Sequence, residues 1–118
     1  MQDRFKFRFW DKETKTMQKY PKVELRNRIT LDAIFDDDRV IFMQSTGLKD
    51  KNSKLIYEGD RVYIDCEDKT AIIKWSDDLA RFTIHFEDEA VFADFDNYYS
   101  KELEVIGNIY ENSELPKE

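Results

Sequence analysis

Hydrophobic and polar side chains alternate along much of this chain with a period of two, which is typical of β-strands. The alternation is clear at residues 5–9, which read Phe-Lys-Phe-Arg-Phe. Because successive strand side chains point to opposite faces, the three Phe side chains are expected in the core. The cations Arg4, Lys6 and Arg8 are then expected on an exposed basic face. Residues 11–15 are polar and predict a hairpin turn, after which residues 16–20 return as an antiparallel strand.

Further segments of the same kind follow, separated by polar turns. The predicted strands are residues 39–44, 55–57, 61–64, 71–75, 81–86 and 103–110. The strands at 60–65, 71–75 and 81–86 are expected to form an antiparallel meander, and the last strand is expected to close the sheet. Gly107 within that last strand predicts a bulge or a close backbone approach. Residues 22–35 fit a strand pair and an irregular connection equally well.

Residues 43–62 combine two turns with the opening of a strand, and we call them the signature segment. Gly47, Asp50 and Asn52 predict an ordered loop, because Gly tolerates positive φ and Asp and Asn side chains bond nearby backbone groups. Glu58-Gly59-Asp60 predicts a second turn. Paired turns of this kind suit small Greek-key or SH3-like barrels, so the fold is predicted to be mainly β.

Composition agrees with a small folded protein. The 118 residues are 41% hydrophobic and 14% aromatic, enough for one core or two small joined subdomains despite 38% charged residues. No apolar run approaches the roughly 18 residues that cross a bilayer, and a cytoplasmic location is expected. Cys66 stands alone, so no internal disulfide can form, and a reduced, partly buried thiol is expected.

Charge is distributed unevenly along the chain, whose net charge is −7. Residues 1–28 hold nine Lys and Arg against four Asp and Glu, whereas residues 65–118 hold five against fifteen. The two regions can attract each other within one chain or between copies, or they can be separate solvated surfaces. The overall acidity disfavours simple coating of nucleic acid, although a local basic strand can still contact a phosphate.

Few residues are candidates for chemistry. His85 lies in a predicted strand and is expected to be structural or at a solvent edge; a proton carrier and a Cys66/His85 nucleophile pair are the alternatives. The acidic runs 36–38, 77–78 and 87–89 lack the ligand spacing of a calcium loop and are expected to be solvated turns. No catalytic residue, metal site or cofactor is predicted. Trp10 can be an exposed interface anchor beside Arg8 or can be covered by the second subdomain.

The signature segment resembles the core of the YopX family, small proteins found mainly in phages and prophages of Gram-positive bacteria. Residues 5–12 and 104–112 agree with the resemblance. It implies an N-terminal β subdomain at 1–45, an SH3-like barrel at 46–112 and a tail at 113–118. It also implies a closed homo-oligomer. The residues assigned to the structural signature are Thr46, Gly47, Leu48, Asp50, Ile56, Tyr57, Glu58, Gly59, Asp60, Val62 and Gly107.

The chain departs from the family pattern at two positions. Ser53 stands where members usually have Gly after the loop Asn, which predicts a shift to another turn type, and Ser113 stands in place of a Pro. Both departures weaken the case for a fixed catalytic residue in these loops.

Together these observations predict a non-catalytic protein-association module of a phage or prophage, acting in the cytoplasm of the bacterial host. A homo-oligomer is expected, and so is an unknown phage or host protein partner. No association with a membrane is expected. Arg4, Lys6, Arg8 and Trp10 are the predicted interface, with the acidic residues 87–96 as its counterpart. The alternative is a nucleic-acid-binding accessory module, and a small hydrolase comes third.

Overall fold

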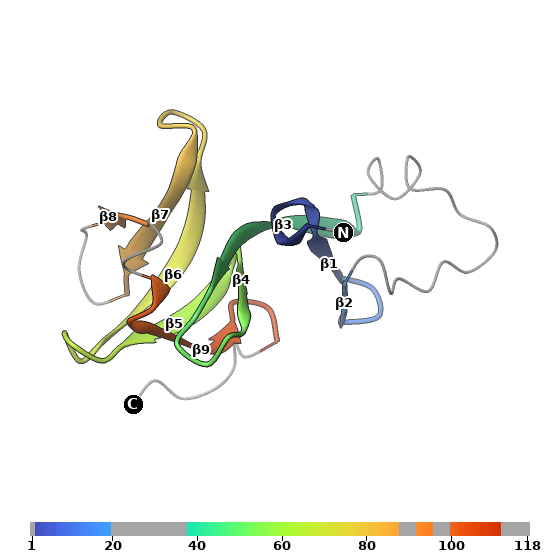
Figure 1. The fold of residues 1–118 in the computed structure, drawn as a ribbon. Coiled ribbons are helices and arrows are strands. Elements are labelled where there is room, and N and C mark those ends of the chain that lie inside the picture. Colours follow the sequence, from blue (N-terminus) through green and yellow to red (C-terminus); the bar gives the residue numbers. More distant parts are fainter. Residues whose placement is uncertain (1, 20–37, 88–91, 96–99, 112–118) are drawn as a thin grey trace.

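The computed structural model describes residues 2–19, 38–87, 92–95 and 100–111. In these ranges the protein is mainly β, as predicted, with nine strands and one short 3-10 helix (Figure 1). Several predictions lie outside the described residues: the segment at 22–35, most of the acidic run at 36–38, and the tail at 113–118. The elements are η1 (Asp3–Phe5), β1 (Phe7–Asp11), β2 (Thr16–Lys19), β3 (Val40–Lys49), β4 (Leu55–Tyr57), β5 (Asp60–Ile64), β6 (Lys69–Ser76), β7 (Arg81–Phe86), β8 (Phe92–Asp94) and β9 (Leu103–Asn108).

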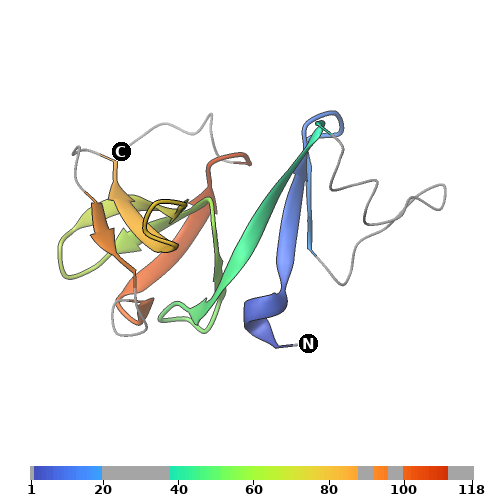
Figure 2. The same cartoon turned by 90° about the horizontal axis from the view of Figure 1, so that it is seen from above.

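The strands form two sheets, of order β2-β1-β3-β4 and β8-β7-β6-β5-β9, in which all described pairs are antiparallel. The predicted meander is confirmed as β5, β6 and β7. β9 pairs with β5 at one edge of the second sheet, and β8 forms the other edge. The described strands of this sheet therefore curl without closing into a barrel (Figure 2).

β3 is the long strand that joins the two halves of the molecule. Its first part, Val40 to Gln44, pairs with β1, and its second part, Ser45 to Lys49, lies beside β4 (Figure 1). The strand runs through residues 45 and 46, where the two predicted subdomains meet. The loop predicted from Gly47, Asp50 and Asn52 is therefore shorter than expected, because the strand includes Gly47 and continues to Lys49 before the chain turns.

The N-terminal strand differs from its prediction. Phe5 belongs to η1 instead of the strand and is 58% exposed, because β1 begins only at Phe7. Phe9 is buried as expected and packs near Phe42, with ring centroids 5.6 Å apart. The predicted Phe face is therefore correct for Phe9 and wrong for Phe5.

The main core fills the curled sheet. It consists of apolar side chains that are fully buried: Ile56, Val62, Ile64, Ala71, Ile73, Ile84 and Leu103. Phe95 is partly buried and packs against this core. The predicted bulge in β9 is confirmed, since Arg61 pairs with Gly107 while the next residue of β5, Val62, pairs with Val105.

Candidate functional site

A buried ion pair lies where the two sheets meet. Arg8 of β1 and Asp60 at the start of β5 approach to 2.7 Å (Nη2 to Oδ1), with side chains only 5% and 2% exposed. Arg8 Nη2 also donates to the Glu58 carbonyl at 3.1 Å, and the Arg8 guanidinium lies 4.7 Å from the centre of the Tyr57 ring. The prediction of Arg8 on an exposed basic face is therefore wrong, because β4 and the turn after it cover that face.

Asp60 also closes the turn of the signature segment. Its Oδ2 accepts the Tyr57 N–H at 2.8 Å, so one carboxylate holds both the turn and Arg8. Burial raises the pKa of Asp60 above its ordinary value, against the opposing effects of Arg8 and the Tyr57 N–H. Arg8 Nε is buried and has no hydrogen-bond partner among the described residues. The carboxylate and guanidinium therefore depend on each other, since each would be an uncompensated buried charge alone.

Gly59 allows this turn to lie close to β3. Its φ is +87°, a region that favours glycine, and a Cβ built there would lie 3.0 Å from the Met43 sulfur. The Gly59 N–H donates to the Ile73 carbonyl at 2.8 Å, which ties the turn to β6 as well. The Glu58-Gly59-Asp60 turn is thus the point at which β3, β5, β6 and the N-terminal sheet converge.

Asp50 organises the other turn of the signature segment. Its Oδ1 accepts the N–H groups of Asn52 and Lys54, both at 2.9 Å, and its Oδ2 accepts the Val105 N–H of β9 at 2.8 Å. Lys51 N–H adds a bond to the Leu103 carbonyl at 2.9 Å. Two backbone groups at the start of edge strand β9, the Leu103 carbonyl and the Val105 N–H, are therefore bonded by this loop, which protects that part of the edge from pairing with another chain.

Ser53 keeps the geometry that glycine would favour at its position. Its φ is +64°, within the left-handed region, and its N–H donates to the Asp50 carbonyl at 3.0 Å. The Asp50 side chain holds the loop on both sides of Ser53.

The predicted interface residues separate in the structure. Arg4 is exposed in η1, and its guanidinium lies 4.6 Å from the centre of the Phe5 ring. Lys6 is half-buried and forms an ion pair with Asp3 at 3.1 Å. Trp10 is half-buried and stacks on Tyr110 at 5.8 Å, so it is covered by the C-terminal part of the chain. Of the predicted acidic counterpart, residues 88–91 and 96 lie outside the described residues, and Glu87 pairs with Arg61 at 3.1 Å.

Cys66 and His85 make separate contacts. Cys66 is exposed, contrary to the prediction of a partly buried thiol, because it lies in the turn between β5 and β6. Its hydrogen bond to Glu102, 3.3 Å from Sγ to Oε2, raises the pKa of the thiol. His85 is half-buried on β7 and bonds the Thr83 hydroxyl at 2.9 Å, while burial lowers its pKa. In the part of the chain that the structure describes, no group of His, Cys, Asp and Glu is arranged to hold a metal ion.

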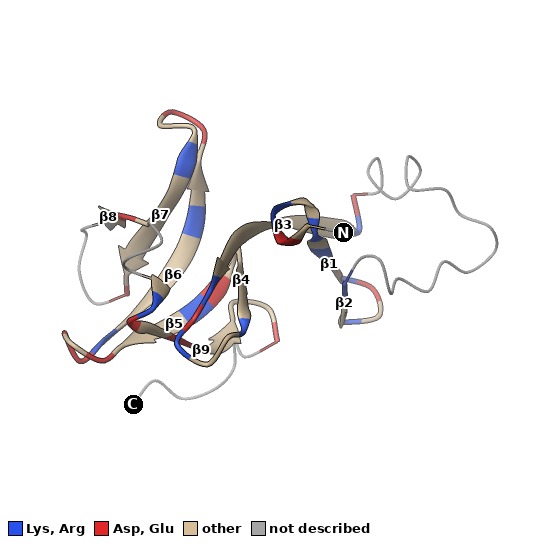
Figure 3. Ribbon diagram, viewed as in Figure 1, with Lys and Arg blue, Asp and Glu red and all other residues tan. Residues whose placement is uncertain are grey.

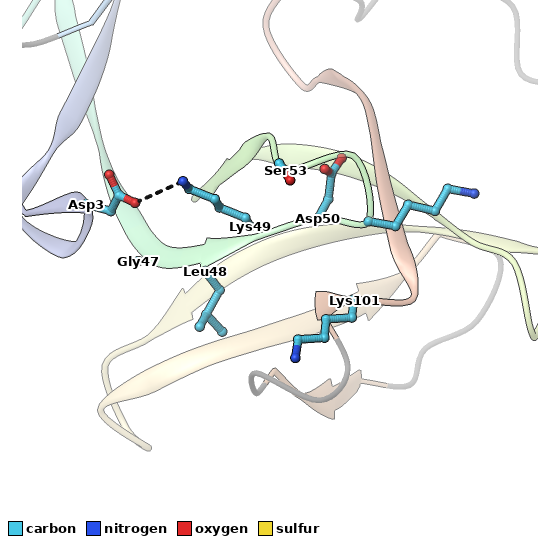
Figure 4. A pocket seen from close by; sticks show the side chains of 8 residues that line it. Asp3, Gly47, Leu48, Lys49, Asp50, Ser53 and Lys101 are labelled. Carbon is cyan, nitrogen blue, oxygen red and sulfur yellow. Dashed lines mark ion pairs between the residues drawn. The ribbon is translucent and has the colours of Figure 1, made fainter.

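A shallow depression of about 560 Å³ lies beside the Asp50 loop (Figure 4). Its cations are Lys49, Lys51 and Lys101. Lys49 points to Asp3 at 3.6 Å, and Lys51 bonds Asp65, which raises the pKa of the lysine. The amino groups of Lys49 and Lys101 point in different directions, so they do not converge on one small anion (Figure 4). Sequence reasoning missed this depression because Lys101 and Asp3 are far in the chain from the lining residues of the Asp50 loop.

The comparisons with known proteins agree with this architecture. The sequence matches the family described as YopX protein over residues 6–117. The chain belongs to the YopX family. The YopX match includes both sheets and the signature segment.

Two solved structures are similar to this YopX-family chain. Protein EF1440 from Enterococcus faecalis is 28% identical, with a TM-score of 0.65 over 95% of this chain and 97% of that one. YopX from Bacillus subtilis is 20% identical, with a TM-score of 0.60 over 97% and 99% of the two chains. The search of curated proteins found no match. Across the described residues, none of the helices has the length and apolarity to span a membrane.

Proposed function

We propose that this YopX-family chain is a non-catalytic protein-association module that forms homo-oligomers. The observation that carries the proposal is the set of large hydrophobic side chains left exposed: Phe5, Trp75, Leu79 and Ile106. Exposed aromatic and apolar side chains next to charges are common anchors of protein interfaces. The buried polar residues of the signature segment, by contrast, are engaged in contacts that hold the fold.

The cellular setting follows from the family. We infer a phage or prophage protein that acts in the cytoplasm of a bacterial host, in keeping with the Enterococcus and Bacillus sources of the two similar structures. We also infer that the five-stranded sheet is an SH3-like barrel element. This is supported by the position of β9 beside β5, the first strand of the meander, since an SH3-like barrel joins its last strand to its first.

The association is tested by absolute mass in solution, from light scattering at low and high salt over a range of protein concentrations. We expect a mass of several chains, with salt weakening any charged part of the interface. A monomer at every concentration and salt would overturn the proposal.

A nucleic-acid-binding accessory module is the second candidate, favoured by the exposed Arg4–Phe5 pair near the lysines of the depression. Bases stack on aromatic rings beside cations, and such binding weakens steeply with salt. Titration with single-stranded DNA and RNA at two salt concentrations tests it, with Phe5→Ala and Arg4→Glu as variants. Binding that both variants abolish would favour this candidate over protein association.

A further inference from the structure

The turn between β6 and β7 forms a projecting tip. The last described pair of β5 and β6 is Arg61 with Ile72, whereas β6 continues to pair with β7 as far as Ser76 and Arg81. The tip therefore extends beyond the support of β5, and Figure 1 shows it at the end of the sheet away from the loop after β3. We call residues 75–79 the tip.

The tip combines acidic and apolar groups. Trp75 is 38% and Leu79 43% exposed, and Trp75 packs edge-on against Phe82 with ring centroids 5.0 Å apart. Trp75 Nε1 donates to Asp77 at 2.8 Å, which fixes the indole beside the turn. Asp78 is exposed as well, and the turn is visibly acidic in Figure 3. The neighbouring cation Arg81 is paired with Asp94 at 3.1 Å.

The depression beside the Asp50 loop has the complementary character. Lys49, Lys51 and Lys101 line it together with Asp3 and Asp50, and the Asp50 carboxylate already accepts three backbone N–H groups. Asp3 pairs with Lys49 and Asp65 with Lys51, so Lys101 is the lining lysine that has no ion pair among the described residues. Arg4 is exposed and lies next to the depression, because its Cβ would be 3.1 Å from a Cβ on the lining residue Gly47. Arg4 and Lys101 are thus cations at this surface that a carboxylate of another chain can meet.

The spacing of the cations selects the kind of occupant. Because Lys49 points to Asp3 and Lys101 points in a different direction, the lysines do not converge on a phosphate, and Lys101 is left for a single carboxylate (Figure 4). An acidic turn with exposed apolar residues supplies such a carboxylate in Asp78, close in sequence to Trp75 and Leu79. The tip and the depression lie at different ends of one molecule, so the chain cannot satisfy both surfaces by itself (Figure 1).

We propose that the tip of one copy docks into the depression of a second copy, with Asp78 facing Lys101. This inference rests on the proposed homo-oligomer and names its interface. The contact is head-to-tail, so it forms a closed ring if the rotation between copies closes. Trp75 and Leu79 are the apolar anchors of the contact.

The test reverses one charge on each surface, Asp78→Lys and Lys101→Glu. Neither side chain has a described intramolecular ion pair. We expect each single variant to weaken self-association at least about tenfold in light scattering, because like charges then oppose each other. The double variant, and an equal mixture of the two single variants, should assemble again. Asp38→Lys and Lys12→Glu are the matched controls, at exposed residues away from both surfaces, and should leave assembly unchanged.

The outcomes separate the inference from the proposed function. A wild-type assembly that both single variants retain would overturn the docking and leave the homo-oligomer in place. Single variants that dissociate without recovery in the double variant or the mixture would overturn the pairing of these two surfaces. A wild-type monomer under all conditions would overturn both proposals.

Discussion

Arg8 and Asp60 are charged residues taken almost completely out of water, which makes each a strong constraint on the other. Arg8 could not be recognised as buried from sequence, because alternation assigns it to the face opposite Phe9 and cannot say that this face is covered too. Asp60 belongs to the structural signature, but its partner Arg8 lies 52 positions earlier in the chain. The sequence therefore indicates a structural role for Asp60 but does not indicate its contact with Arg8.

Removing one member of this pair should be costly. We expect Arg8→Met to lower the free energy of unfolding by about 3–5 kcal/mol, because Asp60 is left as an uncompensated buried charge. Asp60→Asn should be costly for the converse reason, because Arg8 loses its counter-charge, although the remaining amide oxygen can take the place of Asp60 Oδ2 and accept the Tyr57 N–H. The double variant Arg8→Met/Asp60→Asn should lose less than the sum of the two. Urea unfolding measures the free energy of unfolding of all three variants. A loss below about 1 kcal/mol in each single variant would contradict the mutual dependence of Arg8 and Asp60.

Cys66 offers a prediction on pH. Its hydrogen bond to Glu102 raises the thiol pKa, so less reactive thiolate is present at a given pH below that pKa. Glu102→Gln should lower the pKa and speed alkylation by iodoacetamide at pH 8, shifting the rate profile to lower pH. Glu13→Gln, in the distant β1–β2 turn, is the control. An unchanged profile in Glu102→Gln would show that this contact does not govern the thiol.

At the scale of elements, the sequence predicted most strands, because period-two alternation and turn residues are local signals. β1, β3 and β8 are the exceptions, and β8 (Phe92–Asp94) was not among the predicted strands. Phe5 and Lys6 continue the alternation, but close packing of η1 over Gly47 ends the strand pattern before Phe7. In β3, Gly47 resembles a loop residue, yet it forms an irregularity within the strand, where the Ser45 and Thr46 side chains bond the N–H groups of Gly47 and Leu48.

The Asp50 loop gives a prediction at this scale. In Asp50→Asn the side chain keeps one oxygen, which can still accept the loop N–H groups. Its amide NH2 group would then face the Val105 N–H, and two donors cannot form a hydrogen bond. We expect hydrogen exchange at Val105 to accelerate at least about tenfold while the Lys54 amide stays protected. Asp50→Ala should expose both amides. Equal acceleration of hydrogen exchange at the Val105 and Lys54 amides in Asp50→Asn would show that the loop and β9 are not held by separate oxygens of Asp50.

At the scale of the whole molecule, the chain was predicted as two subdomains, and nothing in local patterning could reveal how they are joined. The structure joins them through one continuous strand, a buried ion pair and the Trp10–Tyr110 stack. The depression also belongs to this scale, since η1, the Asp50 loop and Lys101 build it together. Sequence patterning cannot find such a site, because its residues lack a common period.

Because the two sheets are joined by these contacts, we expect the chain to unfold in a single transition, which the two tryptophans can report. Trp10 lies in the N-terminal sheet and Trp75 in the C-terminal sheet. In the single-tryptophan variants Trp75→Phe and Trp10→Phe, urea midpoints by fluorescence should coincide after correction for the stability of each variant. Adding Asp60→Asn should move the Trp10 transition to lower urea than the Trp75 transition. Separate midpoints without Asp60→Asn would contradict tight coupling of the sheets.

The Asp50 loop and the Arg8–Asp60 pair also constrain how the protein can be made. During synthesis from the N-terminus, Arg8 emerges long before Asp60, and Asp50 emerges before the Val105 N–H that its second oxygen accepts. A nascent chain ending before β9 leaves β5 with an uncovered edge and the Asp50 loop with nothing to cover. The ribosome must therefore deliver the chain through β9 before these contacts can form, and translation products that stop short of β9 should be substrates for proteases instead of functional fragments.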